Sequence, residues 1–304
     1  MTRKEFLEKS IKAVGAIALS KMVTLDSKLF GKSLSNYPDL VAVRSGEADE
    51  MFDVGIKALG GIERFVKKGQ SVVVKPNIGW DKRPEEAANT NPKLVKRIVE
   101  ACYQAGAKKV YVFDRTCDYW ENCYKNSGIQ EAAESVGGII VSANEEKDFK
   151  AIKINGAKIV PEAKIHYLIL ESDVFINVPV LKSHGGGRVT SAMKNLMGIV
   201  WDRRIWHSKG LHQAIAEFCL YKKPDLNIVD AYRVMTKNGP RGISLSDVSI
   251  LKNQFLSTDI VAVDVAAIKT FGLDPFSVNY IEYAKELRLG ETDLTKLEIA
   301  RLSV

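Results

Sequence analysis

Residues 173–198 read DVFINVPVLKSHGGGRVTSAMKNLMG. After the aspartate comes a mostly apolar run at 174–178, which is typical of a buried parallel strand. A polar, glycine-rich segment follows at 182–188, and residues 190–200 then have the apolar spacing of a helix. Ligands of open α/β sheets bind beyond the carboxyl ends of the strands. This order of strand, loop and helix is therefore the first indication of both the fold and the site.

The alternation of strands and helices extends outward from this stretch in both directions. A run of valines at 71–75 predicts another buried strand. A helix is expected at 92–105, with Asn91 as its N-cap and Pro92 at its first position, where these residue types are preferred. Repeated strand–helix units predict an α/β fold, with a mainly parallel sheet and helices on both faces. Further strands are expected at 40–44, 109–113, 138–141, 226–229, 247–251 and 297–301, and further helices at 47–59, 119–135, 210–220, 259–270 and 278–287.

One segment departs from this alternation. Apolar runs at 151–154 and 157–160 flank Asn155 and Gly156, a residue pair preferred in two-residue hairpin turns. We therefore expect a small antiparallel hairpin as an insertion. Because no internal repeat or low-complexity linker divides the chain, we expect residues 37–304 to form a single α/β domain.

The composition is that of a folded protein, with 46% hydrophobic and 27% charged residues. No apolar run is long enough to cross a bilayer. The net charge is +7, of which residues 1–36 contribute +4, so the rest of this large chain carries only +3. So mild a charge, without a zinc-finger, RNP or basic-zipper pattern, argues against nucleic acid as a partner.

Residues 1–36 form a signal-like or docking segment. Residues 2–8 resemble a twin-arginine export signal in which Lys4 replaces the second arginine, and a short apolar stretch follows at 13–19. The alternative is an amphipathic helix that docks on the body of the protein, because apolar residues also recur there at helical spacing. We favour export or membrane tethering over a cytoplasmic location.

Polar side chains follow four of the predicted strands. Lys75 and Asn77 end the valine strand, Asp114 follows the next one, Lys182 follows the 174–178 strand, and Asp230 follows the 226–229 strand. If these strands are parallel, their carboxyl ends lie along one edge of the sheet. We therefore expect these side chains to share one crevice.

The segment 182–212 carries the strongest charge in the body of the protein. It contains six lysines and arginines against one aspartate, and three of the four histidines of the chain. Its glycine run, which includes Gly185 and Gly186, would let backbone N–H groups approach an anion at the start of the following helix. Neither the phosphate-loop template nor the dinucleotide fingerprint occurs, so the sequence predicts a small anionic ligand without naming it.

The helix expected at 190–200 has one apolar side and one small or polar side. Lys194 and Asn195 lie on the polar side together with Ser191 and Gly198. This side faces either solvent or a ligand, and the sequence leaves both alternatives open.

Asp264 stands on an otherwise apolar helix face, where a carboxylate needs a partner or a raised pKa. Lys75, Lys182 and Lys194 are the expected partners. The pair would be either a structural ion pair or part of a catalytic group.

His184 follows Lys182 and precedes three glycines, which makes it a candidate acid–base group, a metal ligand or a residue that caps a backbone group. His207 is the second candidate metal ligand, whereas His212, five residues further on, has poor spacing for a shared ion. The four cysteines show no C-x-x-C spacing, so we expect ordinary thiols and no zinc ribbon or ferredoxin-type cluster.

Several of these segments together resemble the prokaryotic family known as domain of unknown function 362. The resemblance covers roughly residues 40–275 and implies an α/β domain without a settled activity. Some members of the family carry an added iron–sulfur segment or a twin-arginine signal, and the present chain lacks the cysteines of the former. The matching runs are VKPN at 74–77, DVFINVPVLKSH at 173–184, VTSAMKNLMG at 189–198, IVD at 228–230, NGPRG at 238–242 and DIVAVD at 259–264.

Two functions fit these observations. In the first, the protein binds a small anion and acts as an enzyme, with Lys182, His184 and Asp264 catalytic. In the second, it is an accessory module that holds a divalent or iron-type metal, or a redox cofactor, for a partner protein, with His184 and His207 as ligands. The ligand-binding residues expected in the first case are Lys75, Asn77, Gly185, Gly186, Lys194, Asn195 and Asp230.

Overall fold

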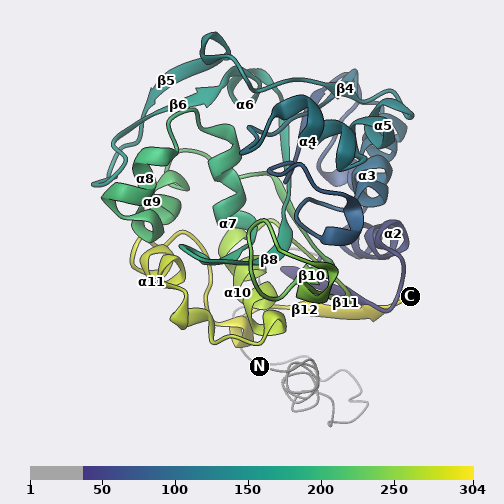
Figure 1. Ribbon diagram of the computed structural model, residues 1–304. Coiled ribbons are helices and arrows are strands. Elements are labelled where there is room, and N and C mark those ends of the chain that lie inside the picture. The colour runs from purple at the N-terminus through teal and green to yellow at the C-terminus, as the bar shows by residue number, and fades with distance from the viewer. Residues whose placement is uncertain (1–36) are drawn as a thin grey trace.

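The computed structural model describes residues 37–304, so the prediction of an export signal lies outside the described residues. Within this part of the chain a central sheet has helices on both sides (Figure 1). No helix within 37–304 is both long enough and apolar enough to span a membrane.

The first half of the described chain alternates strands and helices and then forms a hairpin. Its elements are β1 Leu40–Arg44, α2 Ala48–Ala58, β2 Ser71–Pro76, α3 Pro92–Gln104, β3 Lys109–Val112, α4 Trp120–Asn126, α5 Ile129–Glu134, β4 Ile139–Ile140, β5 Phe149–Lys153, β6 Glu162–His166 and α6 Tyr167–Glu171.

The second half contains the longest strands and the short helices near the predicted site. Its elements are β7 Val174–Val178, β8 Val180–His184, β9 Arg188–Thr190, α7 Ala192–Asn195, α8 Arg204–Lys209, α9 Leu211–Phe218, β10 Leu226–Met235, β11 Val248–Ser257, α10 Ile260–Phe271, α11 Asn279–Glu286 and β12 Ile299–Ser303.

The sheet has the strand order β12-β1-β11-β10-β7-β2-β3-β4, with β8 joined to β10 and β9. The strands from β10 to β4 along this order are all parallel, whereas β11 runs antiparallel to both of its neighbours. The predicted α/β class with a mainly parallel sheet is therefore confirmed. In the parallel part Lys75 lies opposite Asn177, which brings polar side chains of two strands to the same level.

The period-2 pattern of the strands divides the core into two layers. Val72 and Val74 belong to the layer that α2, α3 and α5 cover, whereas Val73 belongs to the layer of α7, α9, α10 and α11. Figure 1 shows these two groups of helices on opposite sides of the sheet. The carboxyl ends of β2, β3 and β7 lie between them.

The predicted hairpin is present, but its loop is longer than expected. β5 and β6 pair antiparallel, and Ile154 N–H donates to the Pro161 carbonyl at 2.8 Å, so Asn155 and Gly156 are part of a longer connection. The predicted second strand at 157–160 is wrong, because that segment is loop and the pairing begins at Glu162.

Three further differences concern the basic segment. The chain does not pass from β7 into a loop and a helix; it continues as β8 and turns back as β9, so the glycine run is the turn of a hairpin. The helix expected at 190–200 consists of the short α7 followed by a 3₁₀ turn at Leu196–Ile199. His207 lies in α8, a short helix between the helices expected at 190–200 and 210–220.

Candidate functional site

A buried ion pair stands at the carboxyl ends of β2 and β3. Lys75 Nζ lies 2.8 Å from Oδ1 of Asp114, and both side chains are almost completely enclosed. Oδ2 of Asp114 accepts a hydrogen bond of 2.7 Å from Ile78 N–H. Burial lowers the pKa of Lys75, and the neighbouring Asp114 carboxylate raises it. The charge of Lys75 is thus balanced within the protein.

Gly198 is required by this ion pair. A Cβ atom at this position would lie 1.8 Å from Oδ1 of Asp114 and 2.7 Å from Nζ of Lys75. The 3₁₀ turn after α7 therefore presses its backbone against the pair, and only a glycine leaves room for it.

A chain of amide side chains connects Lys75 to Lys182. Oδ1 of Asn195 accepts hydrogen bonds of 3.0 Å from Lys75 Nζ and from Asn77 Nδ2. Oδ1 of Asn77 in turn accepts one of 3.0 Å from Lys182 Nζ. Nδ2 of Asn195 donates to Oδ1 of Asn177 at 2.9 Å, which fixes the orientation of the network. The predicted convergence at one edge is therefore observed for Lys75, Asn77, Asp114 and Lys182, and Asn195 of α7 and Asn177 of β7 join them.

Lys182 is a buried lysine without a carboxylate partner in the part of the chain that is described. Only 1% of it is exposed, and its ammonium group donates to Oδ1 of Asn77 and to the carbonyl of Ala88. Burial, together with repulsion from Lys194 and Lys75, lowers the pKa of Lys182 to about 7. Its hydrogen bonds therefore go to neutral oxygens, and Asp114 and Cys117 favour its charge electrostatically without forming a salt bridge to it.

Lys194 has fewer hydrogen-bond acceptors than Lys182. The residue is 8% exposed, and its ammonium group contacts the sulfur of Met197 at 3.5 Å, with no oxygen acceptor among residues 37–304. Burial and the neighbouring Arg203 lower the pKa of Lys194 to about 8. Gly187 allows this position, because a Cβ atom there would lie 2.7 Å from Cε of Lys194. The polar side of the helix expected at 190–200 was predicted to face either solvent or a ligand. The solvent-facing alternative is wrong, because this side is buried.

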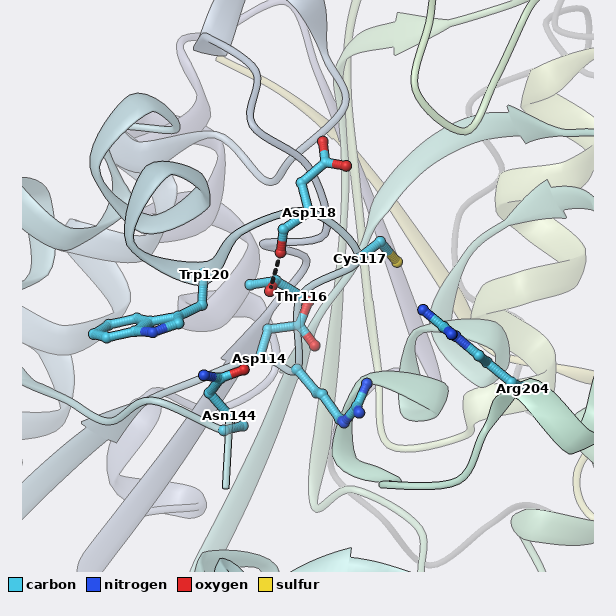
Figure 2. Close-up of a pocket in the computed structure, with 9 residues that line it drawn as sticks. Asp114, Thr116, Cys117, Asp118, Trp120, Asn144 and Arg204 are labelled. Carbon is cyan, nitrogen blue, oxygen red and sulfur yellow. Dashed lines mark hydrogen bonds between the residues drawn. The ribbon is translucent and has the colours of Figure 1, made fainter. Parts of the chain in front are cut away.

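One arginine, Arg203, and the Cys117 thiol lie near these lysines. Arg203 donates to the carbonyls of Arg115 at 2.6 Å and Thr116 at 2.8 Å, and to the Cys117 sulfur at 3.2 Å. Cys117 is exposed and interacts electrostatically with both Lys182 and Lys194. It lines a pocket of about 170 Å³, in which Figure 2 shows its sulfur turned toward Arg204.

The three histidines of the basic segment gather around the β8–β9 turn. His184 Nδ1 accepts a hydrogen bond of 3.0 Å from Gly187 N–H, so the imidazole caps its own turn. Burial and the surrounding cations lower the pKa of His184 to about 2, which keeps the ring neutral. His207 and His212 also have lowered pKa values. Within 37–304 no group of three or more His, Cys, Asp or Glu side chains is placed to hold a metal ion.

Two predicted carboxylates do not join the lysines. Asp264 accepts hydrogen bonds from the backbone N–H groups of Ala192, at 2.5 Å, and Met193, at 3.0 Å. The expectation of a lysine partner is therefore wrong, because backbone donors at the start of α7 satisfy this carboxylate. Asp230 accepts from Asn91 N–H at 2.7 Å and Tyr232 N–H at 3.0 Å. Burial raises the pKa of both aspartates to about 6.

The two glycines of the predicted anion loop also lie away from a helix start. Gly185 and Gly186 are exposed at the tip of the β8–β9 turn, and α7 begins only at Ala192. The physical reason is that Arg188 to Thr190 pair with β8 and so separate the turn from the helix.

Sequence reasoning did not place Asn177, Arg203, Cys117 and Gly198 among the ligand or catalytic residues. Asn177 has a usable signal, because a lone amide inside a fully buried strand requires polar partners. Arg203 and Cys117 have none, because each belongs to a loop whose path depends on the tertiary fold.

The chain is similar to several known proteins. A thylakoid-associated protein from Synechocystis sp. is 26% identical over 251 residues, which span 78% of this chain and 74% of that protein. Among solved structures, a protein from Thermotoga maritima matches with a TM-score of 0.45 and 10% identity over 78% of this chain. The lactate racemase apoprotein from Thermoanaerobacterium thermosaccharolyticum matches with a TM-score of 0.41 and 11% identity over 70% of this chain. The matches cover 59% and 53% of those two structures.

The sequence profile of one family matches residues 72–269, which include every member of the lysine and amide network. This is the family that the motifs around Lys75, Lys182 and Lys194 resemble. The chain belongs to the family described as domain of unknown function 362.

Proposed function

We propose that the protein binds a small anion between Lys182 and Lys194. The observation that carries this proposal is that two adjacent ammonium groups are buried, and that neither has a carboxylate partner within 37–304. Burying an ammonium group without a counterion is costly, so proteins seldom retain two such groups side by side. A bound anion would supply the missing charge.

Arg203 also supports an anion site, because it is a further cation without a carboxylate partner in the described chain. Its guanidinium contacts carbonyl oxygens and the Cys117 sulfur, and no carboxylate of the described chain pairs with it. An anion that enters past Cys117 would therefore meet a third cation before it reaches the lysines.

The anion hypothesis has more support than the metal hypothesis. The imidazole of His184 uses Nδ1 to accept a backbone N–H, and the surrounding lysines would repel a cation. The same positive charges that would repel a cation would attract an anion. An enzymatic role would use the anion as part of a substrate.

A thermal-shift panel tests this function. Acetate, pyruvate, oxalate, sulfate and phosphate are each added at matched ionic strength, with chloride as the control. We expect at least one of them to raise the melting temperature of the wild type, because ligand that binds only the native state stabilises it. The shift should be lost in Lys182→Met and Lys194→Met. If no anion exceeds the chloride control, or if both variants keep the full shift, the proposal is wrong.

A further inference from the structure

Two pockets meet at Arg115 and Arg204. The polar pocket has a volume of about 170 Å³, and most of its walls belong to the loop that follows β3. The apolar pocket has a volume of about 460 Å³, and Trp201 and Ile205 form its apolar wall. Because both pockets include the two arginines, one ligand can contact both of them and extend into each pocket. Figure 2 shows the polar pocket with Arg204 on the side that Cys117 faces.

The Arg115 side chain has no acceptor of its own in the part of the chain that is described. Its guanidinium lies over the Trp201 ring, 4.1 Å from the ring centroid, and its buried Nε–H has no hydrogen-bond acceptor within 37–304. Burial, together with repulsion from Arg203 and Arg204, lowers the pKa of Arg115. A buried donor without an acceptor is costly, and an anion at this point would accept from the free donors and offset the repulsion.

The carboxylates that line the two pockets leave these arginines unpaired. Asp114 pairs with Lys75 at 2.8 Å, and Asp118 pairs with Arg241 at 3.6 Å. Asp202 is exposed beside the apolar pocket and forms no ion pair with either arginine. Both pocket arginines are therefore without an ion-pair partner among residues 37–304.

The fold holds the walls of both pockets in place. Arg115 N–H donates to the Gly198 carbonyl at 2.9 Å, and Arg203 donates to the Arg115 carbonyl at 2.6 Å. The Trp201 ring packs against Phe149 of the β5–β6 hairpin, with 5.1 Å between the ring centroids. The hairpin insertion thus supports the apolar wall. Walls that are fixed in advance reduce the entropy cost of binding.

We propose that Arg115 and Arg204 form a second binding site, which takes an organic phosphomonoester with a flat apolar group. The phosphate would lie between the two guanidinium groups, and the flat group would lie against Trp201 and Ile205. Arginine presents a planar fork of N–H donors that matches phosphate oxygens, and a phosphate dianion carries charge for two such groups, whereas a carboxylate carries charge for one. This site goes beyond the proposed function, because neither lysine of the anion site lines either pocket.

Isothermal titration calorimetry with three probes tests the ligand class. Phenyl phosphate, inorganic phosphate and benzoate are titrated into the wild type at pH 7.5 and matched ionic strength. We expect phenyl phosphate to bind about ten-fold more tightly than either of the others, because it alone offers both the dianion and the flat group. Equal affinity for inorganic phosphate would overturn the apolar contact, and equal affinity for benzoate would overturn the preference for phosphate; either result contradicts the proposed ligand class.

Two variants test the two ends of the site. Arg204 is exposed, so Arg204→Met should keep the fold and weaken phenyl phosphate binding about ten-fold through loss of charge-assisted hydrogen bonds. Trp201→Leu should weaken phenyl phosphate much more than inorganic phosphate. Arg301→Met is the matched control, because Arg301 is an exposed arginine of β12, at the other end of the strand order. If Arg204→Met binds phenyl phosphate as tightly as Arg301→Met does, the proposal is wrong.

The outcomes also distinguish this site from the lysine site. Lys194→Met should keep most of its affinity for phenyl phosphate, and Arg204→Met should keep the thermal shift with oxalate. If phenyl phosphate binding is lost in Lys194→Met and kept in Arg204→Met, the phosphate lies on the lysines and the inference is overturned. If oxalate fails to bind the wild type while phenyl phosphate binds through Arg204, only the proposed function is overturned. Circular dichroism and thermal unfolding of each variant confirm that lost binding is not caused by a lost fold.

Discussion

The site contains two kinds of buried lysine, which differ in whether a carboxylate partner balances the ammonium charge. Lys75 has a carboxylate counterion, Asp114, at 2.8 Å and an amide oxygen at 3.0 Å, and burial still lowers its pKa. Lys182 and Lys194 have neutral oxygens and a thioether. The contrast teaches that burial alone does not mark a functional lysine. We propose burial without a counterion as the marker, because binding of an anion would offset the cost of burying the charge.

The largest expected effect on stability concerns Lys75, the lysine that has a carboxylate partner. Lys75→Met leaves the Asp114 carboxylate buried and unpaired, so the free energy of unfolding should fall by about 3 to 5 kcal/mol. Urea denaturation measures this. Asp114→Asn in the Lys75→Met background should recover part of the loss, and a single variant as stable as the wild type would show that the pair is not structural.

Gly198→Ala should lower the free energy of unfolding through a steric clash with the Lys75–Asp114 ion pair. Its Cβ would overlap the ion pair, and overpacking of this kind costs about 1 to 3 kcal/mol. Gly185→Ala is the matched control, because a Cβ there meets no atom within 4 Å. Equal stabilities of the two variants by urea denaturation would contradict the described packing.

For a buried lysine that has no carboxylate partner in the described chain, removal of the charge should stabilise the protein. Lys194 has its pKa lowered from 10.5 to about 8, so charging it opposes folding, and Lys194→Met should gain about 1 to 3 kcal/mol at pH 7. Between about pH 8 and 10.5 the unfolded chain binds more protons than the native one, so the wild type gains stability as pH rises. The advantage of Lys194→Met should therefore shrink by pH 10. A variant that is less stable than the wild type at pH 7 would contradict this.

The smallest effect concerns the thiol at the approach to the site. Cys117 is exposed, whereas Cys102, Cys123 and Cys219 are buried and burial raises the pKa of each thiol to about 12. Iodoacetamide should therefore label Cys117 alone in the native protein, and oxalate should slow the labelling several-fold. Mass spectrometry after timed quenching measures the rate, with urea-unfolded protein as the control in which all four react. Labelling of a buried cysteine at the same rate would argue against the described site.

The fold and part of the site could be predicted from the sequence. Continuous valine runs and helix caps indicate parallel strands and their connecting helices, and parallel strands place Lys75 and Lys182 at one edge. The hairpin turn is harder to predict, because the glycines at 185–187 suit both an anion loop and a β-turn, and only the pairing of β8 with β9 decides between them. The partner of Asp264 depends on which backbone N–H groups are left free at the start of α7, and no spacing rule contains that information.

The most direct test of the contrast between the two lysine groups is the number of protons taken up when oxalate binds at pH 8.5. It is measured by isothermal titration calorimetry in two buffers of different ionisation enthalpy. Because an anion raises the lowered pKa values of Lys182 and Lys194, we expect net proton uptake by the wild type at pH 8.5 that nearly vanishes at pH 6. Binding with no proton exchange at either pH would contradict the assignment of these two lysines as the anion site.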